Sequence, residues 1–124
     1  MFDNDISPRL AAMLNALDVD VFALRDKFPP DTKDVDFLER LKGSGIVLIS
    51  ANTSMRTNAI ESRVLKQANI TALYLGPFGG RMGLWRQAEW LIKHWPTIDG
   101  FARGVATGTC AEIKQNGKSR IYPL

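Results

Sequence analysis

Acidic side chains gather in the first third of the chain. Residues 1–39 carry nine Asp or Glu against four Lys or Arg, whereas residues 40–124 carry twelve basic and four acidic side chains. Carboxylate oxygens are hard ligands that suit Mg²⁺ or Mn²⁺, which proteins bind through a few carboxylates, water and phosphate oxygens. A metal held in this way can activate water and stabilise an in-line displacement at a phosphodiester. The carboxylates considered are Asp3, Asp5, Asp31, Asp34 and Asp36.

The elements that must position these side chains follow from hydrophobic periodicity. The pattern predicts strands at about 1–2, 19–24, 46–49 and 71–75, and helices at about 8–17, 34–42, 56–67 and 84–95. Ser7 and Pro8 suit the start of the first helix, and Pro96 is expected to end the last, with an irregular stretch over 99–108. Asn116-Gly117 predicts a type I′ hairpin near the C-terminus.

Alternation of strands and helices implies a mostly parallel sheet covered by helices. In such sheets, ligand sites lie outside the carboxyl ends of the strands. Asp3-Asn4-Asp5 follows the first strand, Ser50-Ala51-Asn52 follows the third, and the loop after the second leads to the later aspartates. We therefore expect these side chains to converge on one rim. Plain structural roles stay open, because Asp3 and Asp5 also suit a turn and Asp34 suits a helix cap.

Several stretches together resemble the PIN-like domains of VapC-type toxins from toxin–antitoxin operons. They are "FDNDISPRLAAML", "VFALRDKFPPDTKDVDFLERL", "GIVLISAN", "RTNAIE" and "GLWRQAEWLIKHWPTI", and they span most of residues 2–98. The resemblance implies a three-layer α/β/α domain with a mostly parallel central sheet, followed here by the C-terminal β-hairpin. We expect one domain over 1–124, with its core at about 1–98 and the hairpin at about 109–123. The implied activity is Mg²⁺- or Mn²⁺-dependent cleavage of RNA by the toxin of a pair, with an antitoxin protein as partner.

The resemblance also implies roles for single residues. The first family carboxylate falls on Asp3, with Asp5 beside it, and the acid at the start of the second helix falls on Asp34, with Asp36 as the weaker choice. The family's Arg-x-Asn-x-x-Glu stretch matches Arg56, Asn58 and Glu61. Asp3, Asp5, Asp34 and Glu61 are thus the expected metal ligands. The expected nucleic-acid contacts in these motifs are Arg9, which closes the opening motif, Arg56 and Asn58. Arg81 and Arg86 join them from the Gly-rich loop and the helix after it, independently of the resemblance.

The stretch after the third strand departs from the family pattern. Relatives usually read Thr-Arg-Asp after the third strand, and this chain reads Ser50-Ala51-Asn52. Asn52 offers a carbonyl oxygen to a metal or a water, but it carries no charge and cannot act as a base. We keep Asn52 with Asp3 and Asp34 as the catalytic candidates. A catalytically impaired module that binds RNA or an antitoxin therefore stays open.

A phosphatase of the haloacid-dehalogenase type is a further alternative. There, Asp3 would be the nucleophile, Asp5 the acid/base and Ser50 the hydroxyl after a later strand. That family also needs a late acidic pair, whereas Gly76-Pro77-Phe78 follows Leu75 here. The phosphatase reading is accordingly the weaker one.

Other conspicuous residues have ordinary structural interpretations. The Gly-rich loop over 76–83 lacks the Gly-Lys-Ser/Thr of a P-loop, so we expect a flexible loop with Arg81 and Arg86 free to contact RNA. Cys110 is expected to be a buried small hydrophobe and His94 a helix-end residue without a catalytic role. Among three tryptophans, we expect Trp85 and Trp95 to pack and Trp90 to be partly exposed, where a base could stack.

Net charge, cysteine count and hydropathy restrict the possible partners and cellular location of the protein. The net charge of +3 is compatible with a polyanionic partner, and a single cysteine excludes an internal disulfide. No apolar run approaches the roughly 20 residues of a membrane helix, and the acidic N-terminus is unlike a signal peptide. We expect a cytoplasmic protein without membrane contact, with a homodimer as an open alternative. The first strand is short, so the natural start is expected to lie upstream of Met1.

Overall fold

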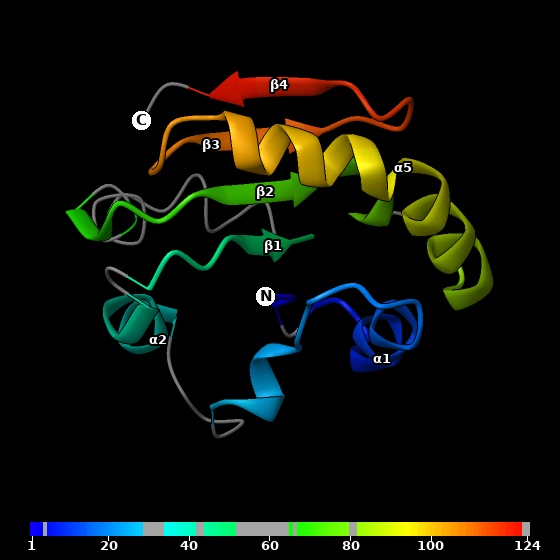
Figure 1. The fold of residues 1–124 in the computed structure, drawn as a ribbon, viewed down its shortest axis with the longest axis horizontal. Coiled ribbons are helices and arrows are strands. Elements are labelled where there is room, and N and C mark those ends of the chain that lie inside the picture. Colours follow the sequence, from blue (N-terminus) through cyan, green and yellow to red (C-terminus); the bar gives the residue numbers. More distant parts are fainter. Residues whose placement is uncertain are drawn as a thin grey trace.

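The computed structural model describes residues 1–3, 5–28, 34–41, 44–51, 65, 67–79 and 82–122. Its strands are β1 (Leu48–Ser50), β2 (Ala72–Leu75), β3 (Cys110–Ile113) and β4 (Ser119–Tyr122). Its main helices are α1 (Pro8–Ala16), α2 (Asp34–Leu41) and α5 (Leu84–Gly104), and Leu24–Asp26 and Gly76–Gly79 form 3₁₀ turns. Figure 1 shows the strands side by side, with α5 in front of the sheet and running roughly along its strands.

The sheet has the order β1-β2-β3-β4. β1, β2 and β3 are parallel to their neighbours, and β4 returns antiparallel to β3. Phe2 extends the sheet beyond β1 through isolated parallel bridges to Ile49 on one side and Ala23 on the other. The spatial order is therefore Ala23, Phe2, β1, β2, β3, β4, which confirms the mostly parallel sheet with a C-terminal hairpin.

The first two predicted strands are reduced to these single bridges. Phe2 donates its amide to the carbonyl of Phe22 at 2.8 Å and accepts from Leu24 at 2.7 Å. Beyond these bonds the backbone turns away on both sides, since Ile6 bonds back to the carbonyl of Asp3 and the 3₁₀ turn begins at Leu24. The ladder stops after one residue because the chain must turn to start the next segment.

Two clusters of buried side chains cover the two faces of the sheet. One joins α1 and α5 to Ile49, Leu73 and Ala111. The other lies on the opposite face and joins Leu41 of α2 and the segment around Leu65 to Leu48, Ala72, Tyr74 and Cys110. Neighbouring strand residues alternate between the clusters, as the two-residue period of a strand requires. The arrangement confirms helices on both sides of the sheet.

Local signals fixed the start of α1 and α2. The Ser7 side chain accepts the amide of Arg9 at 3.2 Å, and Pro8 occupies the first turn of α1. α2 begins at Asp34, as predicted. The predicted helix over 56–67 lies largely outside the described residues, with Leu65, Gln67 and Ala68 helical.

α5 does not end at Pro96, which corrects the prediction. The helix continues for eight residues to Gly104, so most of the stretch expected to be irregular is helical. Proline removes one amide hydrogen bond and usually kinks a helix, and α5 bends in its middle (Figure 1). The helix persists because Leu91, Trp95 and Ile98 keep facing the same core at helical spacing. Among the described residues, no helix is both long and apolar enough to cross a membrane.

The C-terminal hairpin lies where the sequence predicts it, but its turn is of a different type. Gly117 bonds back to the carbonyl of Lys114 at 2.8 Å, and the amide of Lys114 bonds to the carbonyl of Lys118. Gly117 has φ +85°, whereas Asn116 is not among the residues with positive φ. A type I′ turn needs positive φ at both central positions. The turn is instead a type I turn closed by a left-handed glycine.

Candidate functional site

The carboxyl ends of two neighbouring parallel strands place Asp3 beside Ser50. Asp3 directly follows Phe2, and its amide bonds to the carbonyl of Ile49 at 2.9 Å. From Asp3 the chain goes on to build the neighbour at Ala23, whereas from Ser50 it leads to β2 on the other side. The strand order therefore reverses between Asp3 and Ser50. Such a switch point at the carboxyl edge is where open α/β sheets bind ligands.

Asp3, Asp5 and Ser50 form one polar cluster at this point, which we call the acidic cluster. The Ser50 hydroxyl donates to Asp3 Oδ2 at 3.1 Å. The same hydroxyl lies 3.5 Å from Asp5 Oδ1 and 3.4 Å from Asp5 Oδ2. One serine thus touches carboxylates that come from the end of the first strand and from the turn that follows it.

The two carboxylates differ in solvent exposure. Asp3 and Ser50 are buried, with relative exposures of 5% and 1%. Asp5 is exposed, and the amide of Ala51 donates to its Oδ1 at 3.2 Å. The tight turn from Asp3 to Ile6, closed at 3.0 Å, brings Asp5 back over the end of β1. The cluster therefore has a buried inner carboxylate and an outer one at the surface.

Hard oxygen donors at this spacing fit a divalent cation. Two carboxylates brought together at one hydroxyl repel each other. A cation offsets the repulsion, and Mg²⁺ or Mn²⁺ needs only one or two carboxylates when water and a phosphate supply the other ligands. Within the described part of the chain, no group of three or more His, Cys, Asp or Glu gathers as a fuller metal site.

The remaining predicted ligands are only partly placed. Asp34 is the first residue of α2, and Asp36 is exposed on the same helix. The position of the Asp34 side chain lies outside what the structure describes, so its approach to Asp3 stays a prediction. Several predicted residues also lie outside the described residues: Asn4, Asp31, Asn52, Arg56, Asn58, Glu61 and Arg81.

Two predicted RNA-binding arginines lie at the surface. Arg9 is exposed in the first turn of α1, and Arg86 is exposed in the first turn of α5. Arg86 lines two neighbouring hollows, one of about 430 Å³ shared with Trp85 and one of about 760 Å³ shared with Lys93.

Trp95 packs against Phe2 as predicted, whereas the other two tryptophans are arranged differently from the prediction. Trp85 is 79% exposed, whereas Trp90 is 7% exposed. Trp90 packs edge-on against Phe78 with ring centroids 5.6 Å apart, and its indole nitrogen donates to the carbonyl of Gln115 at 2.9 Å. The exposed indole is therefore that of Trp85, whereas Trp90, the predicted stacking residue, is buried. Helical spacing alone could not say which of the three indoles the loop after β2 would cover.

The side chains of His94 and Cys110 pack against other parts of the fold. The His94 ring lies 4.9 Å from the ring of Trp90, and a Cβ at Gly117 would come within 2.5 Å of its Nδ1. Cys110, the first residue of β3, is buried in the core as predicted.

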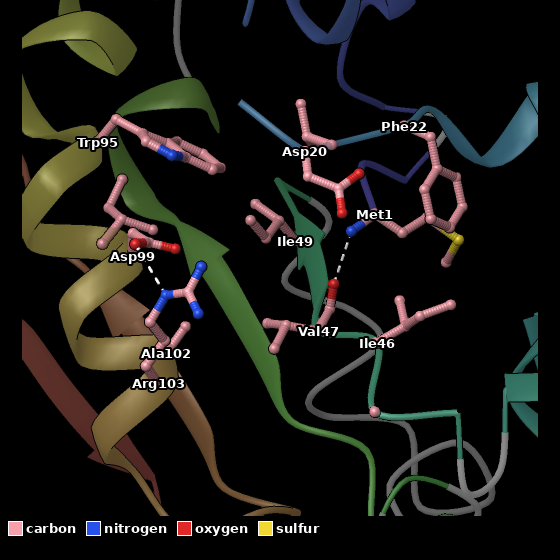
Figure 2. A pocket seen from close by; sticks show the side chains of 13 residues that line it. Met1, Asp20, Phe22, Ile46, Val47, Ile49, Trp95, Asp99, Ala102 and Arg103 are labelled. Carbon is pink, nitrogen blue, oxygen red and sulfur yellow. Dashed lines mark hydrogen bonds and ion pairs between the residues drawn. The ribbon is translucent and has the colours of Figure 1, made fainter. Parts of the chain in front are cut away.

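A separate hollow, of about 370 Å³, lies at the opposite edge of the sheet (Figure 2). There the amine of Met1 donates to the carbonyl of Val47 at 2.7 Å. Burial lowers the pKa of this amine from 8.0 to about 5, against the opposing attraction of Asp20. Asp99 and Arg103 form an ion pair of 3.0 Å on another wall. This hollow holds the amino ends of the strands, so it is separate from the acidic cluster.

Sequence comparison agrees with the geometry. A parallel α/β sheet with carboxylates at its switch point defines a class of domains that bind a ligand or metal at the carboxyl edge. The family description "PIN like domain" matches residues 1–77, which is more than half of the chain and includes the acidic cluster. The chain belongs to the PIN-like domain family, whose members are generally nucleases. No curated protein and no solved structure matches it.

Proposed function

We propose that this protein is a Mg²⁺- or Mn²⁺-dependent endoribonuclease. The observation that carries the proposal is the acidic cluster, in which Asp3 and Asp5 meet at the hydroxyl of Ser50. Membership of a family of nucleases supports the reaction class, and the switch point gives a reason for the position of the cluster.

Each residue of the cluster has a separate task in this proposal. Asp3, buried and oriented by Ser50, is the inner metal ligand, and Asp5 at the surface is the outer one that also faces incoming RNA. A cation held there would stabilise the negative charge that develops as the phosphodiester is attacked, and it would lower the pKa of a bound water. Burial of Asp3 keeps its carboxylate in one orientation, so little reorganisation is needed when substrate binds.

Further residues complete the proposed site. Asp34 and Glu61 are additional ligand candidates, and Asn52 would orient water through its side-chain carbonyl. The cationic side chains would contact RNA phosphates, and Asn58 would support them. These proposed RNA contacts are Arg9, Arg56, Asn58, Arg81 and Arg86.

The biological role that fits best is the toxin of a toxin–antitoxin pair, restrained by a cognate antitoxin protein in the cytoplasm. The resemblance to VapC-type sequences supports this role. A second candidate is a binding module without activity, which is favoured by the neutral Asn52 where relatives carry an acid.

A cleavage assay tests the proposal. The purified chain is incubated with a structured RNA in Mn²⁺, in Mg²⁺ and in EDTA, beside Asp3→Asn. We expect cleavage with either metal, none in EDTA, and a loss of about a hundredfold or more in Asp3→Asn, because the neutral amide keeps the hydrogen bond to Ser50 but removes the charge.

Asp18→Asn is the matched control, since Asp18 is exposed and has a φ of 64°, which asparagine also tolerates. Undiminished cleavage by Asp3→Asn would refute the proposed site. If the unaltered chain binds RNA but cuts none, the binding module is correct instead.

A further inference from the structure

Trp85 is the most exposed large apolar side chain among the described residues, at 79%. Its neighbours in the helix do not cover it: Arg86 and Glu89 are exposed, and Ile92 is 52% exposed. Exposing a whole indole to water is unfavourable, because its large apolar area contributes favourable free energy only when it is buried against another surface. An exposed indole next to a charged residue therefore points to a ligand with a flat apolar face and a charge.

The position of Trp85 relative to the acidic cluster follows from how α5 is anchored. Trp90 contacts Phe78, just beyond β2, and Gln115, just beyond β3, so it lies at the carboxyl edge of the sheet. The other end of α5 reaches the opposite edge, where Arg103 lines the hollow with Met1. Trp85 precedes Trp90 by five residues, which carries it about 7.5 Å further out past the carboxyl edge. Figure 1 shows the first turns of α5 projecting on this side.

The same helix relates Trp85 to Asp3. Trp95 packs edge-on against Phe2 with ring centroids 6.1 Å apart, and Phe2 directly precedes Asp3. Ten residues of helix separate Trp95 from Trp85, which corresponds to about 15 Å. A few nucleotides of extended single strand can cover such a span.

The surface beside Trp85 is suited to a polyanion. Trp85 and Arg86 line one hollow together with Met82 and Gly83. Arg86 continues into the neighbouring hollow, where Lys93 adds a second exposed cation against the single acid Glu89. Single-stranded nucleic acid is bound by aromatic faces that stack on bases and by cations that follow the backbone.

We propose that Trp85 is a stacking platform for an unpaired RNA base, with Arg86 contacting the adjoining phosphate, a few nucleotides from the bond that is cut. This inference rests on the proposed function. Both residues lie outside the part of the chain that matches the family. The charge of the surface and its position at the edge that carries the acidic cluster favour RNA over a protein as the occupant.

Binding to single-stranded RNA in EDTA tests the inference without any cleavage. A labelled oligonucleotide of mixed sequence is titrated with the unaltered chain, Trp85→Ala and Trp85→Phe, with fluorescence anisotropy as the readout. We expect Trp85→Ala to weaken binding by about five- to a hundredfold, and Trp85→Phe to retain most of it, because stacking needs only an aromatic face.

Two matched measurements sharpen the result. Arg86→Ala should lower the slope of log affinity against log salt by about 0.7, as expected for one lost phosphate contact on a single strand. Arg103→Ala, an exposed cation at the far end of the same helix, should change neither affinity nor slope. RNA should also reduce acrylamide quenching of the tryptophan fluorescence, and this reduction should be absent in Trp85→Ala, which keeps only Trp90 and Trp95.

Several outcomes would overturn the inference. Unchanged binding by Trp85→Ala would do so, as would equal losses in Trp85→Ala and Trp85→Phe. Self-association that depends on Trp85 would instead assign the surface to a second copy of the chain. The two proposals can fail separately: an unaltered chain that binds RNA through Trp85 but cuts nothing removes only the nuclease, and full cleavage by Trp85→Ala with unchanged binding removes only the stacking platform.

Discussion

Ser50 carries a single hydroxyl hydrogen and faces two carboxylates. It lies 3.1 Å from Asp3 and 3.4 Å from the nearer oxygen of Asp5, at a position with 1% exposure. Groups that orient a metal ligand without touching the metal typically change affinity by about 10- to 100-fold when removed. The hydroxyl of Ser50 has this position relative to Asp3.

Replacing this hydroxyl should therefore affect metal affinity more than stability. We expect Ser50→Ala to weaken Mn²⁺ binding about tenfold or more, because Asp3 loses a donor that helps to orient its carboxylate. Ser50→Thr keeps the hydroxyl and should retain most of the affinity. Isothermal titration with Mn²⁺ measures both, and equal affinities for Ser50→Ala and the unaltered chain would show that Ser50 does not orient the site.

In a chain that starts at Met1, the buried terminal amine gives the fold a pH dependence of its own. Burial lowers its pKa from 8.0 to about 5, so between these values the unfolded chain binds a proton that the native chain does not. Stability should therefore fall as the pH drops from 8 to 5, by up to about 4 kcal/mol.

Urea unfolding at pH 8.5 and pH 5.5 checks this, with an N-acetylated chain as the control. Acetylation removes the titrating group, and the difference between the two chains isolates its contribution from the carboxylates and His94. Identical pH dependence in both chains would contradict a buried neutral amine.

Residue chemistry was only partly accessible from sequence. The positions of Asp3 and Asp5 after a short strand were enough to expect an acidic rim. The sequence did not predict that Ser50 would contact both carboxylates. Its position at the end of a buried parallel strand did place it near the expected rim. Which tryptophan is exposed depends on the loop after β2 and on Gln115, which are contacts that no local pattern encodes.

At the scale of elements, the hairpin turn is held by Gly117 in a left-handed conformation against α5. Its φ is +85°, and a Cβ there would lie 2.5 Å from His94 Nδ1. We expect Gly117→Ala to lower the free energy of unfolding by about 1–3 kcal/mol, through backbone strain and displacement of the His94 ring.

Gly100→Ala is the matched control. Gly100 lies inside α5 with nothing within 4 Å of an added Cβ, so alanine should stabilise the protein by about 0.5–1 kcal/mol. Thermal unfolding of both variants provides the measurement. A Gly117→Ala protein as stable as the unaltered chain would contradict the close approach of the turn to His94.

Helix starts and the hairpin position, which have strong local sequence signals, were predicted correctly. Where tertiary packing outweighed the local signal, the prediction was wrong. The cap at Ser7-Pro8, the start of α2 at Asp34 and the hairpin position followed from sequence. The end of α5 did not, because burial of Ile98 on the core outweighs the hydrogen bond lost at Pro96. The strands predicted at about 1–2 and 19–24 are shorter than expected, because each pairs through a single residue before the chain turns.

At the scale of the whole molecule, the order of the strands in the sheet determines where the acidic cluster forms. Alternating strands and helices implied a parallel sheet, and that sheet forms with helices on both faces. The reversal of strand order between Phe2 and β1 could not be read from the sequence, because it depends on which strands pair. That reversal brings Asp3 next to Ser50, and it separates the acidic cluster from the hollow around Met1 at the opposite edge.

The central claim is that the acidic cluster holds a divalent metal ion, and a Mn²⁺ titration followed by electron paramagnetic resonance tests it most directly. The signal of free Mn²⁺ is recorded as metal is added to the unaltered chain, to Asp3→Asn and to the control Asp18→Asn. We predict that the unaltered chain and the control bind Mn²⁺ alike and that Asp3→Asn binds it at least about tenfold more weakly, since it loses an anionic ligand. Equal Mn²⁺ uptake by Asp3→Asn and the unaltered chain would contradict the claim.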